Sequence, residues 1–399
     1  MKNIWYNSKK KEVIITEIYL DNAATTKMDN RVFEEMLPYL KEKYGNPSSA
    51  YKIARDNKEI IEKARKEVAL NLNANPSEIY FTSGGSESDN MALKGIALSN
   101  IDKGKHIITS KIEHPAVLDT CKELEREGFE ISYIGVDENG IVDLKELEDT
   151  IRKDTILISI MFANNEIGTI QPIDEIGQIA KKYNILFHTD SVQAIGNVKI
   201  DVKNMNIDSL SLSAHKFYGP KGIGVLYLRD GVKFRKYLNG GHQERNRRAG
   251  TENVAGIVGL AKALTIAYEN LEENNNRTIE LRNYFINEIK KNIEGVKING
   301  DLIKRLPGNI SISFEFVEAD NILHELDEKG IYISTGSACT TGSIESSHVL
   351  KSIGLSDAVA HSTIRISIGK YNSQEDIDYT IKCLIDVVDK LRKLSPLYC

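Results

Sequence analysis

The sequence is poor in cysteine. It contains four in 399 residues, and no two of them form a C-x-x-C pair. They are Cys121, Cys339, Cys383 and Cys399. Such wide spacing excludes a disulfide framework, argues against a structural zinc site, and is typical of a protein in the reducing cytoplasm. Each cysteine is therefore predicted to be either a small buried apolar residue or a reactive thiol.

Long apolar runs are also missing. No stretch approaches the roughly 20 residues that span a bilayer, and residues 1–11 lack the apolar core of a signal peptide. The formal net charge of -5 gives no general attraction to nucleic acid or to an anionic membrane. We therefore predict a cytoplasmic protein with no direct nucleic-acid partner and no membrane partner.

The composition that is present, 41% hydrophobic and 27% charged residues, is that of a soluble globular protein. Its length predicts two domains. Predicted strands alternate with predicted helices through the first half, which indicates an α/β fold with a mostly parallel sheet flanked by helices. The predicted strands of this sheet are residues 78–82, 106–110, 130–134, 155–161, 185–188, 209–213 and 223–228.

The rest of the chain shows a different order of predicted helices and strands. Residues 253–293 are helical in pattern and are predicted to carry the chain from one domain to the next, and residues 274–276, all asparagine, are predicted to form a turn. Strands near 310–316, 331–334 and 364–368, separated by helices, then predict a smaller α+β domain. We place the large domain at 26–265 and the small one at 266–399, with 1–25 packing nearby.

The stretch 209–222 gives the first indication of chemistry. Serine and leucine alternate over 209–213, the pattern of a strand packed on at least one side, and glycine and proline then end it. Lys216 is thus predicted at a strand end, beside the Ser213 hydroxyl and the His215 imidazole. This setting suits a Schiff base to pyridoxal phosphate next to groups that hold its phosphate. The alternative is a solvated surface lysine.

A second candidate site follows the first predicted strand. Residues 83–89 include Gly85 and Ser86 and lead into a helix predicted from Asn90. Glycines before a helix leave free backbone N–H groups and the positive end of the helix dipole facing an anion. The alternative is a helix cap at Ser86.

Two further candidate residues, Asp190 and His114, follow predicted strands. Asp190 lies 26 positions before Lys216 and could bond a pyridine nitrogen and keep it protonated. His188 and Asp190 could instead ligate a metal, but a third ligand at suitable spacing is missing, so we predict no metal site. His114, just before Pro115, could stack on a flat ring and move protons, or could simply cap a helix.

Two residues of the predicted small domain can act on a substrate. Cys339 lies within 334–343, whose residues offer almost no apolar area to bury, so a mobile loop with a reachable thiol is predicted. A few per cent of free thiol is thiolate near neutral pH, which makes Cys339 a candidate nucleophile. Arg365 is suited to a substrate carboxylate, with a surface ion pair as the alternative.

Several motifs extend this picture over nearly the whole chain. They lie at 19–26, 82–90, 113–114, 164–168, 188–193, 213–216, 248–251 and 336–340. Together they resemble the cysteine desulfurases of the NifS/IscS type, which are pyridoxal-phosphate enzymes of fold type I related to class V aminotransferases. The 336–340 motif on a long loop resembles the group that includes NifS and IscS.

The resemblance implies a role for each matching residue. Lys216 would bind the cofactor covalently, His114 would stack on its ring, Asp190 would pair with the pyridine nitrogen and Gln193 with the phenolic oxygen. The phosphate would be held by Gly85, Ser86, Ser213 and His215, with Thr251 contributed by the second subunit of a homodimer. The substrate carboxylate would be held by Asn165 and Arg365.

The implied reaction converts L-cysteine to L-alanine and leaves the sulfur on Cys339 as a persulfide. An acceptor protein, such as an iron-sulfur scaffold or a tRNA-thiolation enzyme, would then take the sulfur. Another class V enzyme, such as a selenocysteine lyase or an aminotransferase, would keep Lys216, Asp190 and Arg365 without needing Cys339. A sulfur-carrying partner without turnover is a third possibility, against which the intact Lys216 and Asp190 argue.

Overall fold

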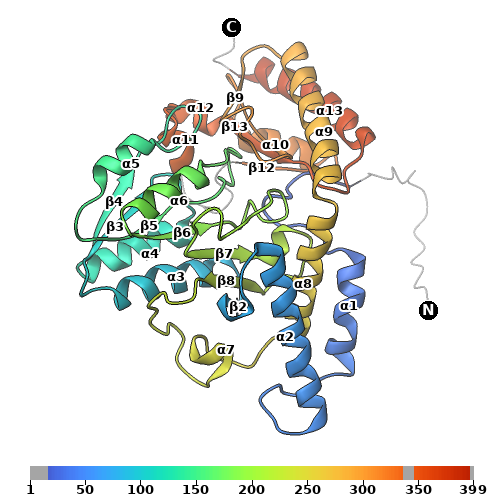
Figure 1. Cartoon of the computed structure of the whole chain (residues 1–399). Coiled ribbons are helices and arrows are strands. Elements are labelled where there is room, and N and C mark those ends of the chain that lie inside the picture. The colour runs from blue at the N-terminus through green and yellow to red at the C-terminus, as the bar shows by residue number, and fades with distance from the viewer. Residues whose placement is uncertain (1–16, 336–345, 396–399) are drawn as a thin grey trace.

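A seven-stranded sheet forms the centre of the computed structural model, which describes residues 17–335 and 346–395 (Figure 1). Its strand order is β2 (Ile79–Thr82), β8 (Gly224–Leu228), β7 (Ser209–Ser213), β6 (Leu186–Asp190), β5 (Thr155–Ser159), β3 (His106–Ser110) and β4 (Glu130–Ile134). In this sheet only β8 runs against its neighbours. The predicted α/β fold with a mostly parallel sheet is confirmed.

Helices cover both faces of this sheet, because successive side chains of its strands pack into different cores. Ile107 packs with α3 (Gly85–Ser99) and α4 (Pro115–Arg126), whereas Ile108 packs with α2 (Lys52–Leu72), α6 (Ile173–Lys182) and α8 (Val254–Glu269). All five residues of β7 are therefore buried, although their alternating sequence required only one buried face.

A second core surrounds a four-stranded sheet in the upper part of Figure 1. Its order is β12 (Ser334–Thr335), β13 (Thr363–Ser367), β10 (Asn309–Phe314) and β9 (Val296–Ile298). The helices α9 (Leu271–Asn292), α10 (Ala319–Asp327) and α13 (Gln374–Leu394) contribute to this core. The elements match the predicted α+β unit, while the boundary between residues 265 and 266 stays a prediction.

The N-terminal segment joins this second core. β1 (Ile18–Tyr19) pairs in parallel with β11 (Ile331–Tyr332), and Ile18 and Leu20 are buried with the apolar residues of α9 and α13. The predicted strand at 331–334 was therefore wrong as a single element. It divides into β11 and β12, which belong to different sheets.

The predicted helical run 253–293 is also divided. α8 and α9 meet at Asn270 with a bend of 70°. The bend arises because α8 packs into the core of the large sheet and α9 into that of the four-stranded sheet. The turn predicted at 274–276 was wrong, because these residues lie within α9.

Among the described residues, no single helix has both the length and the apolarity to cross a membrane. The pair α8 and α9 passes that test together, by length and composition alone, despite the bend between them. The apolar side chains of α8, including Ile257, Leu260 and Leu264, are buried in the protein core.

Candidate active site

The predicted site residues meet at one edge of the large sheet, where β3, β5, β6 and β7 have their carboxyl ends. A cavity of about 270 Å³ opens there. It is lined by predicted residues from both parts of the sequence: Gly85, Ser86, His114, Asn165, Asp190, Gln193, Ser213, His215, Lys216 and Arg365. Ligands gather at this edge in α/β sheets because the strand ends leave a crevice between neighbouring loops.

Lys216 lies in the short 3₁₀ turn that follows β7, so the prediction of a strand-end lysine is confirmed. Its Nζ donates hydrogen bonds to the carbonyl oxygens of Ala23 and Ala24, the latter at 3.0 Å. Gln193 Nε2 donates to the same Ala23 oxygen at 3.0 Å. The N-terminal segment thus forms one wall of the cavity, a role that the sequence analysis did not assign to it.

His215 contacts this same segment. Its Nδ1 lies 3.1 Å from the Thr25 hydroxyl. Burial, with Lys216 and Lys221 nearby, lowers the pKa of His215 to about 4, so the ring is neutral near pH 7. With Nδ1 facing Thr25, Nε2 is the nitrogen that can donate to an anion in the cavity.

The first turn of α3 supplies an anion site. The helix begins at Gly85 and its N-cap is Gly84, which makes no side-chain capping bond, so the alternative of a cap at Ser86 was wrong. N–H groups of a first turn lack partners within the helix and favour negative charge. A Cβ at Gly85 would lie 2.6 Å from Val192 Cγ2, so the close approach of backbone to cavity requires glycine.

His114 both caps a helix and lines the cavity. Its Nδ1 accepts a hydrogen bond from the backbone N–H of Ala116 at 3.1 Å, at the start of α4. An accepting Nδ1 places the proton of the neutral ring on Nε2. Burial lowers the pKa of His114, which keeps the ring neutral near pH 7. The helix-capping alternative is confirmed, and the stacking and proton-transfer role stays a prediction that the position of His114 at the cavity allows.

Asp190 is buried at the end of β6, and its Oδ1 accepts the Val192 N–H at 2.9 Å. Burial raises the pKa of Asp190 above its usual value. The alternative of a metal site at His188 and Asp190 finds no support. The His188 nitrogens lie 2.9 Å from Ser159 Oγ and 3.1 Å from Ser211 Oγ, and no cluster of three metal-ligating side chains occurs in residues 17–335 and 346–395.

Asp89 is a cavity residue that the sequence analysis missed. It is buried on α3, its Oδ1 has no hydrogen-bond partner in the part of the chain that the structure describes, and His188 Nε2 lies 3.7 Å away. Burial, with the charge of Asp190 nearby, raises the pKa of Asp89 well above its usual value. Its spacing of three from Ser86 places both on one side of the helix, which could have indicated it.

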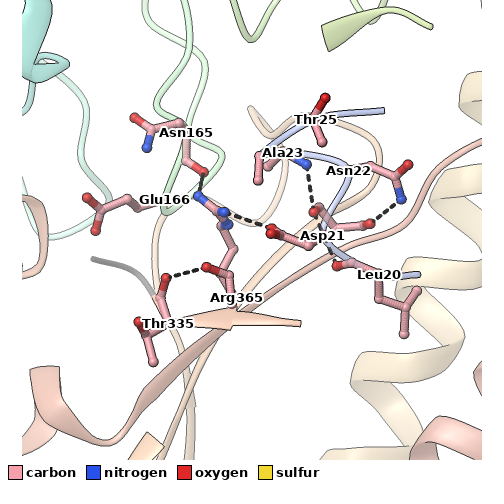
Figure 2. Close-up of polar contacts among 12 residues, drawn as sticks. Leu20, Asp21, Asn22, Ala23, Thr25, Asn165, Glu166, Thr335 and Arg365 are labelled. Atoms are coloured by element: carbon pink, nitrogen blue, oxygen red, sulfur yellow. Dashed lines mark hydrogen bonds and ion pairs between the residues drawn. The ribbon is translucent and has the colours of Figure 1, made fainter. Parts of the chain in front are cut away.

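Arg365 anchors the opposite wall (Figure 2). It extends from β13, is only 3% exposed, and is therefore not the surface ion pair considered as its alternative. Nη2 pairs with Asp21 Oδ1 at 2.8 Å, and Nη1 donates to the carbonyl oxygen of Asn165 at 3.2 Å. This cationic group reaches the cavity from the second core, so the site lies where the two cores meet.

Thr251 is the one described residue of the predicted site that does not line this cavity. The residue is exposed. Nearby Arg248 is held by Glu87 of α3, with Nε and Oε1 2.7 Å apart. Cys339 lies outside the described residues, which resume at Ser346 after β12 ends at Thr335.

Comparison with known proteins identifies the family. Residues 18–380 match the model of aminotransferase class V. The chain is 55% identical over 380 residues to "Cysteine desulfurase IscS" of Methanosarcina thermophila, which covers 95% of this chain and 94% of that protein.

The chain is a class V aminotransferase family member of the cysteine desulfurase group.

Solved structures agree with this family assignment. A "NIFS-like protein" superposes with a TM-score of 0.89 at 42% identity, covering 94% of this chain and all of that one. A structure described as "SspA in complex with cysteine" has a TM-score of 0.78 at 39% identity and covers 90% of this chain and all of that one. The predicted fold type I is confirmed for this family member.

Family membership makes pyridoxal phosphate the cofactor of this class V protein, and the cavity fits it. The first turn of α3 beside Gly85 suits a phosphate. The buried Asp190 carboxylate needs a cationic partner to ionise, and a pyridinium nitrogen is one. Lys216 places in the same cavity an amine of the kind that a covalent bond to the cofactor would require.

Glu113, buried beside His114, is expected to make the stability of the fold depend on pH. Burial raises its pKa to about 8, although Ser110 Oγ and the Met161 N–H both donate to its Oε1. The folded protein therefore keeps a proton that the unfolded chain releases above about pH 4.5. Stability should fall as the pH rises toward 8, by about 1.4 kcal/mol per pH unit for this group.

Glu113→Gln removes this titration. We expect the difference in free energy of unfolding, variant minus wild type, to grow from about pH 5 to about pH 8, as measured by denaturant unfolding. Glu127→Gln, at an exposed position, is the control and should give curves parallel to those of the wild type. Parallel curves for Glu113→Gln as well would show that Glu113 is ionised in the folded protein.

Proposed function

We propose that this protein is a cysteine desulfurase that converts L-cysteine to L-alanine and transfers the sulfur to Cys339 as a persulfide. The observation that carries the proposal is the single cavity that joins Lys216, His114 and Asp190 to the guanidinium of Arg365. Relatives that share about half of its sequence over nearly the full length are named for the same activity. These names support a desulfurase over a selenocysteine lyase or an aminotransferase.

Several residues of the cavity have a part in this reaction. Pyridoxal phosphate, when bound, supplies an electron sink that stabilises negative charge on the α-carbon of an amino acid. Lys216 Nζ would hold the cofactor, and the same amine could take the α-proton of the substrate and return it to the α-carbon of alanine. Asn165 and Arg365 orient the substrate carboxylate, and Asp190 keeps the pyridine nitrogen protonated.

The transfer of sulfur to Cys339 needs no external oxidant, because the electrons of the broken carbon–sulfur bond stay with the substrate carbon. The Cys339 thiolate attacks the substrate sulfur, the bond between that sulfur and the β-carbon breaks, and a sulfur–sulfur bond forms on Cys339. The β-carbon gains a proton, for which neutral His114 with its proton on Nε2 is a suitable donor. The products are alanine and the persulfide of Cys339.

A homodimer is part of the proposal. The exposed Thr251 would complete the phosphate site of a second copy. Apolar side chains on one face of α1 (Asn30–Lys41) support an interface, since Phe33, Leu37 and Leu40 are 49%, 44% and 60% exposed. Their spacing of four and three places them on one stripe of the helix. Sedimentation of the full-length protein in solution tests for twice the chain mass.

The persulfide would be delivered in the cytoplasm to an acceptor protein, either an iron-sulfur scaffold or a tRNA-thiolation enzyme. A persulfide sulfur is electrophilic, so the acceptor chemistry is a thiolate. Adding candidate acceptors after treatment with cysteine, and following the mass of each protein, would show which of them takes the sulfur.

The activity test uses the holoenzyme with L-cysteine and a thiol reductant. We expect alanine and sulfide in equal amounts, and one additional sulfur on the protein in mass spectra taken before reduction. Formation of a keto acid without sulfide would indicate an aminotransferase. Absence of any product from a protein that carries its cofactor would contradict the proposal.

A further inference from the structure

The anchor for the substrate carboxylate is already held by a carboxylate of this chain. Arg365 Nη2 pairs with Asp21 Oδ1 at 2.8 Å, and Figure 2 shows the two side chains pointing toward each other. Arg365 Nη1 donates to the Asn165 carbonyl oxygen, and Nε is buried without a hydrogen-bond partner among residues 17–335 and 346–395. Each Nη carries a second N–H, so the Nη1–Nη2 end of a guanidinium that lines the cavity keeps donors for an incoming anion.

An entering carboxylate meets the negative charge of Asp21 at Arg365, with one of two results. It displaces Asp21 from Nη2, or it shares the same guanidinium with Asp21 and the two negative charges repel. Either event opposes the binding of the carboxylate. The competition matters more for a ligand that has no other strong contact in the cavity, because its affinity depends on Arg365 alone.

The side chain of Asp21 can release Arg365 without moving its backbone. The Asp21 carbonyl accepts a hydrogen bond from the Tyr19 hydroxyl at 2.9 Å, and Asp21 forms a β-bridge with Ser367 of β13. The carboxylate itself is 18% exposed, whereas the side chain of Arg365 is 3% exposed. Water can therefore replace Arg365 as the partner of Asp21, while the guanidinium stays in place.

We propose that Asp21 is a specificity-determining residue that competes with ligand carboxylates for Arg365 and so excludes carboxylates that lack an amino group. An amino acid offsets the competition because its amine would replace Lys216 in the covalent bond to the cofactor, whereas a simple carboxylate gains only Arg365. The same competition weakens retention of the product alanine. The inference rests on the proposed function, in which Arg365 holds the substrate carboxylate.

The test measures binding of propionate, which has a carboxylate but neither amine nor thiol. Titration calorimetry on the holoenzyme compares wild type with Asp21→Asn, whose amide oxygen can still accept from Nη2 while the negative charge is lost. We expect propionate to bind about fivefold more tightly, the scale of a partly exposed ion pair. The KM for L-cysteine should fall with little change in kcat.

Two control variants separate competition at Arg365 from a change in overall charge and from a loss of folding. Asp102→Asn makes the same charge change at an exposed position and should leave propionate binding as in the wild type. Asp21→Ser is a second uncharged variant and should bind propionate as tightly as Asp21→Asn does. It replaces Asp21→Asn in the test if that variant unfolds at a lower temperature than the wild type. Unchanged or weaker propionate binding in the folded Asp21 variants would overturn the inference.

Arg365→Gln distinguishes failure of the inference from failure of the proposed function. If this variant loses propionate binding and raises the KM for L-cysteine while the Asp21 variants behave as wild type, only the competition is wrong. If Arg365→Gln leaves both unchanged, Arg365 is not the carboxylate anchor, and the proposed substrate site is wrong as well.

Discussion

Lys216→Ala is expected to remove both the bound-cofactor absorption near about 420 nm and the desulfurase activity. Lys216 Nζ lies in the cavity within hydrogen-bond reach of the Ala24 carbonyl, so its amine is already positioned by the backbone. Without it no covalent bond to the cofactor forms and no amine takes the α-proton. The activity should fall by at least about 10³-fold, as when other essential nucleophiles are removed.

The measurement combines an absorption spectrum with alanine production from L-cysteine. Lys221→Ala removes a neighbouring exposed lysine and should keep both signals. Borohydride should bleach the wild-type band and attach the cofactor permanently to Lys216, which peptide mass spectrometry locates. A borohydride-reduced cofactor found on any other lysine would disprove the assignment.

Cys339→Ser is expected to have a comparable effect on turnover but none on the cofactor spectrum. A serine hydroxyl is not ionised near neutral pH and cannot accept a sulfur atom, so the transfer has no receiver. Alanine and sulfide production should fall by at least about 10³-fold, while the band near about 420 nm remains. This separation of spectrum from turnover distinguishes loss of the acceptor from loss of the cofactor.

Cys399→Ser is the matched control, because it removes a thiol to which no role has been assigned. Mass spectra after treatment with L-cysteine should show the added sulfur on a peptide containing Cys339 in both the wild type and the control. If Cys339→Ser still releases alanine and sulfide at the wild-type rate, sulfur transfer does not depend on Cys339. The proposed persulfide would then be wrong.

Local sequence pattern was sufficient for most of the fold. The strand predicted at 106–110 occurs as β3, and the strand 209–213 occurs as β7, because buried strands need runs of apolar or small residues ended by glycine or polar turns. The long run 253–293 was misread for a physical reason. Helical periodicity continues through Asn270, and only the two separate cores bend the chain there.

The sequence predicted those site residues whose side chains have a characteristic chemistry, such as the amine of a lysine. Lys216, His114 and Asp190 follow strands that end at one sheet edge, so the alternation of strands and helices was enough to bring them together. Asp89 was missed because its chemistry depends on complete burial, which a single position in a helical pattern does not reveal.

The sequence by itself determined the fold class, the family and the residues that can do the chemistry, because periodicity and motifs are written in neighbouring positions. The tertiary structure alone decided which distant groups hold them. Asp21 meets Arg365 across 344 positions, and Ala24 meets Lys216 across 192. Such pairs depend on how two cores pack against one segment, and the energy of that packing is shared by many residues that no local pattern connects.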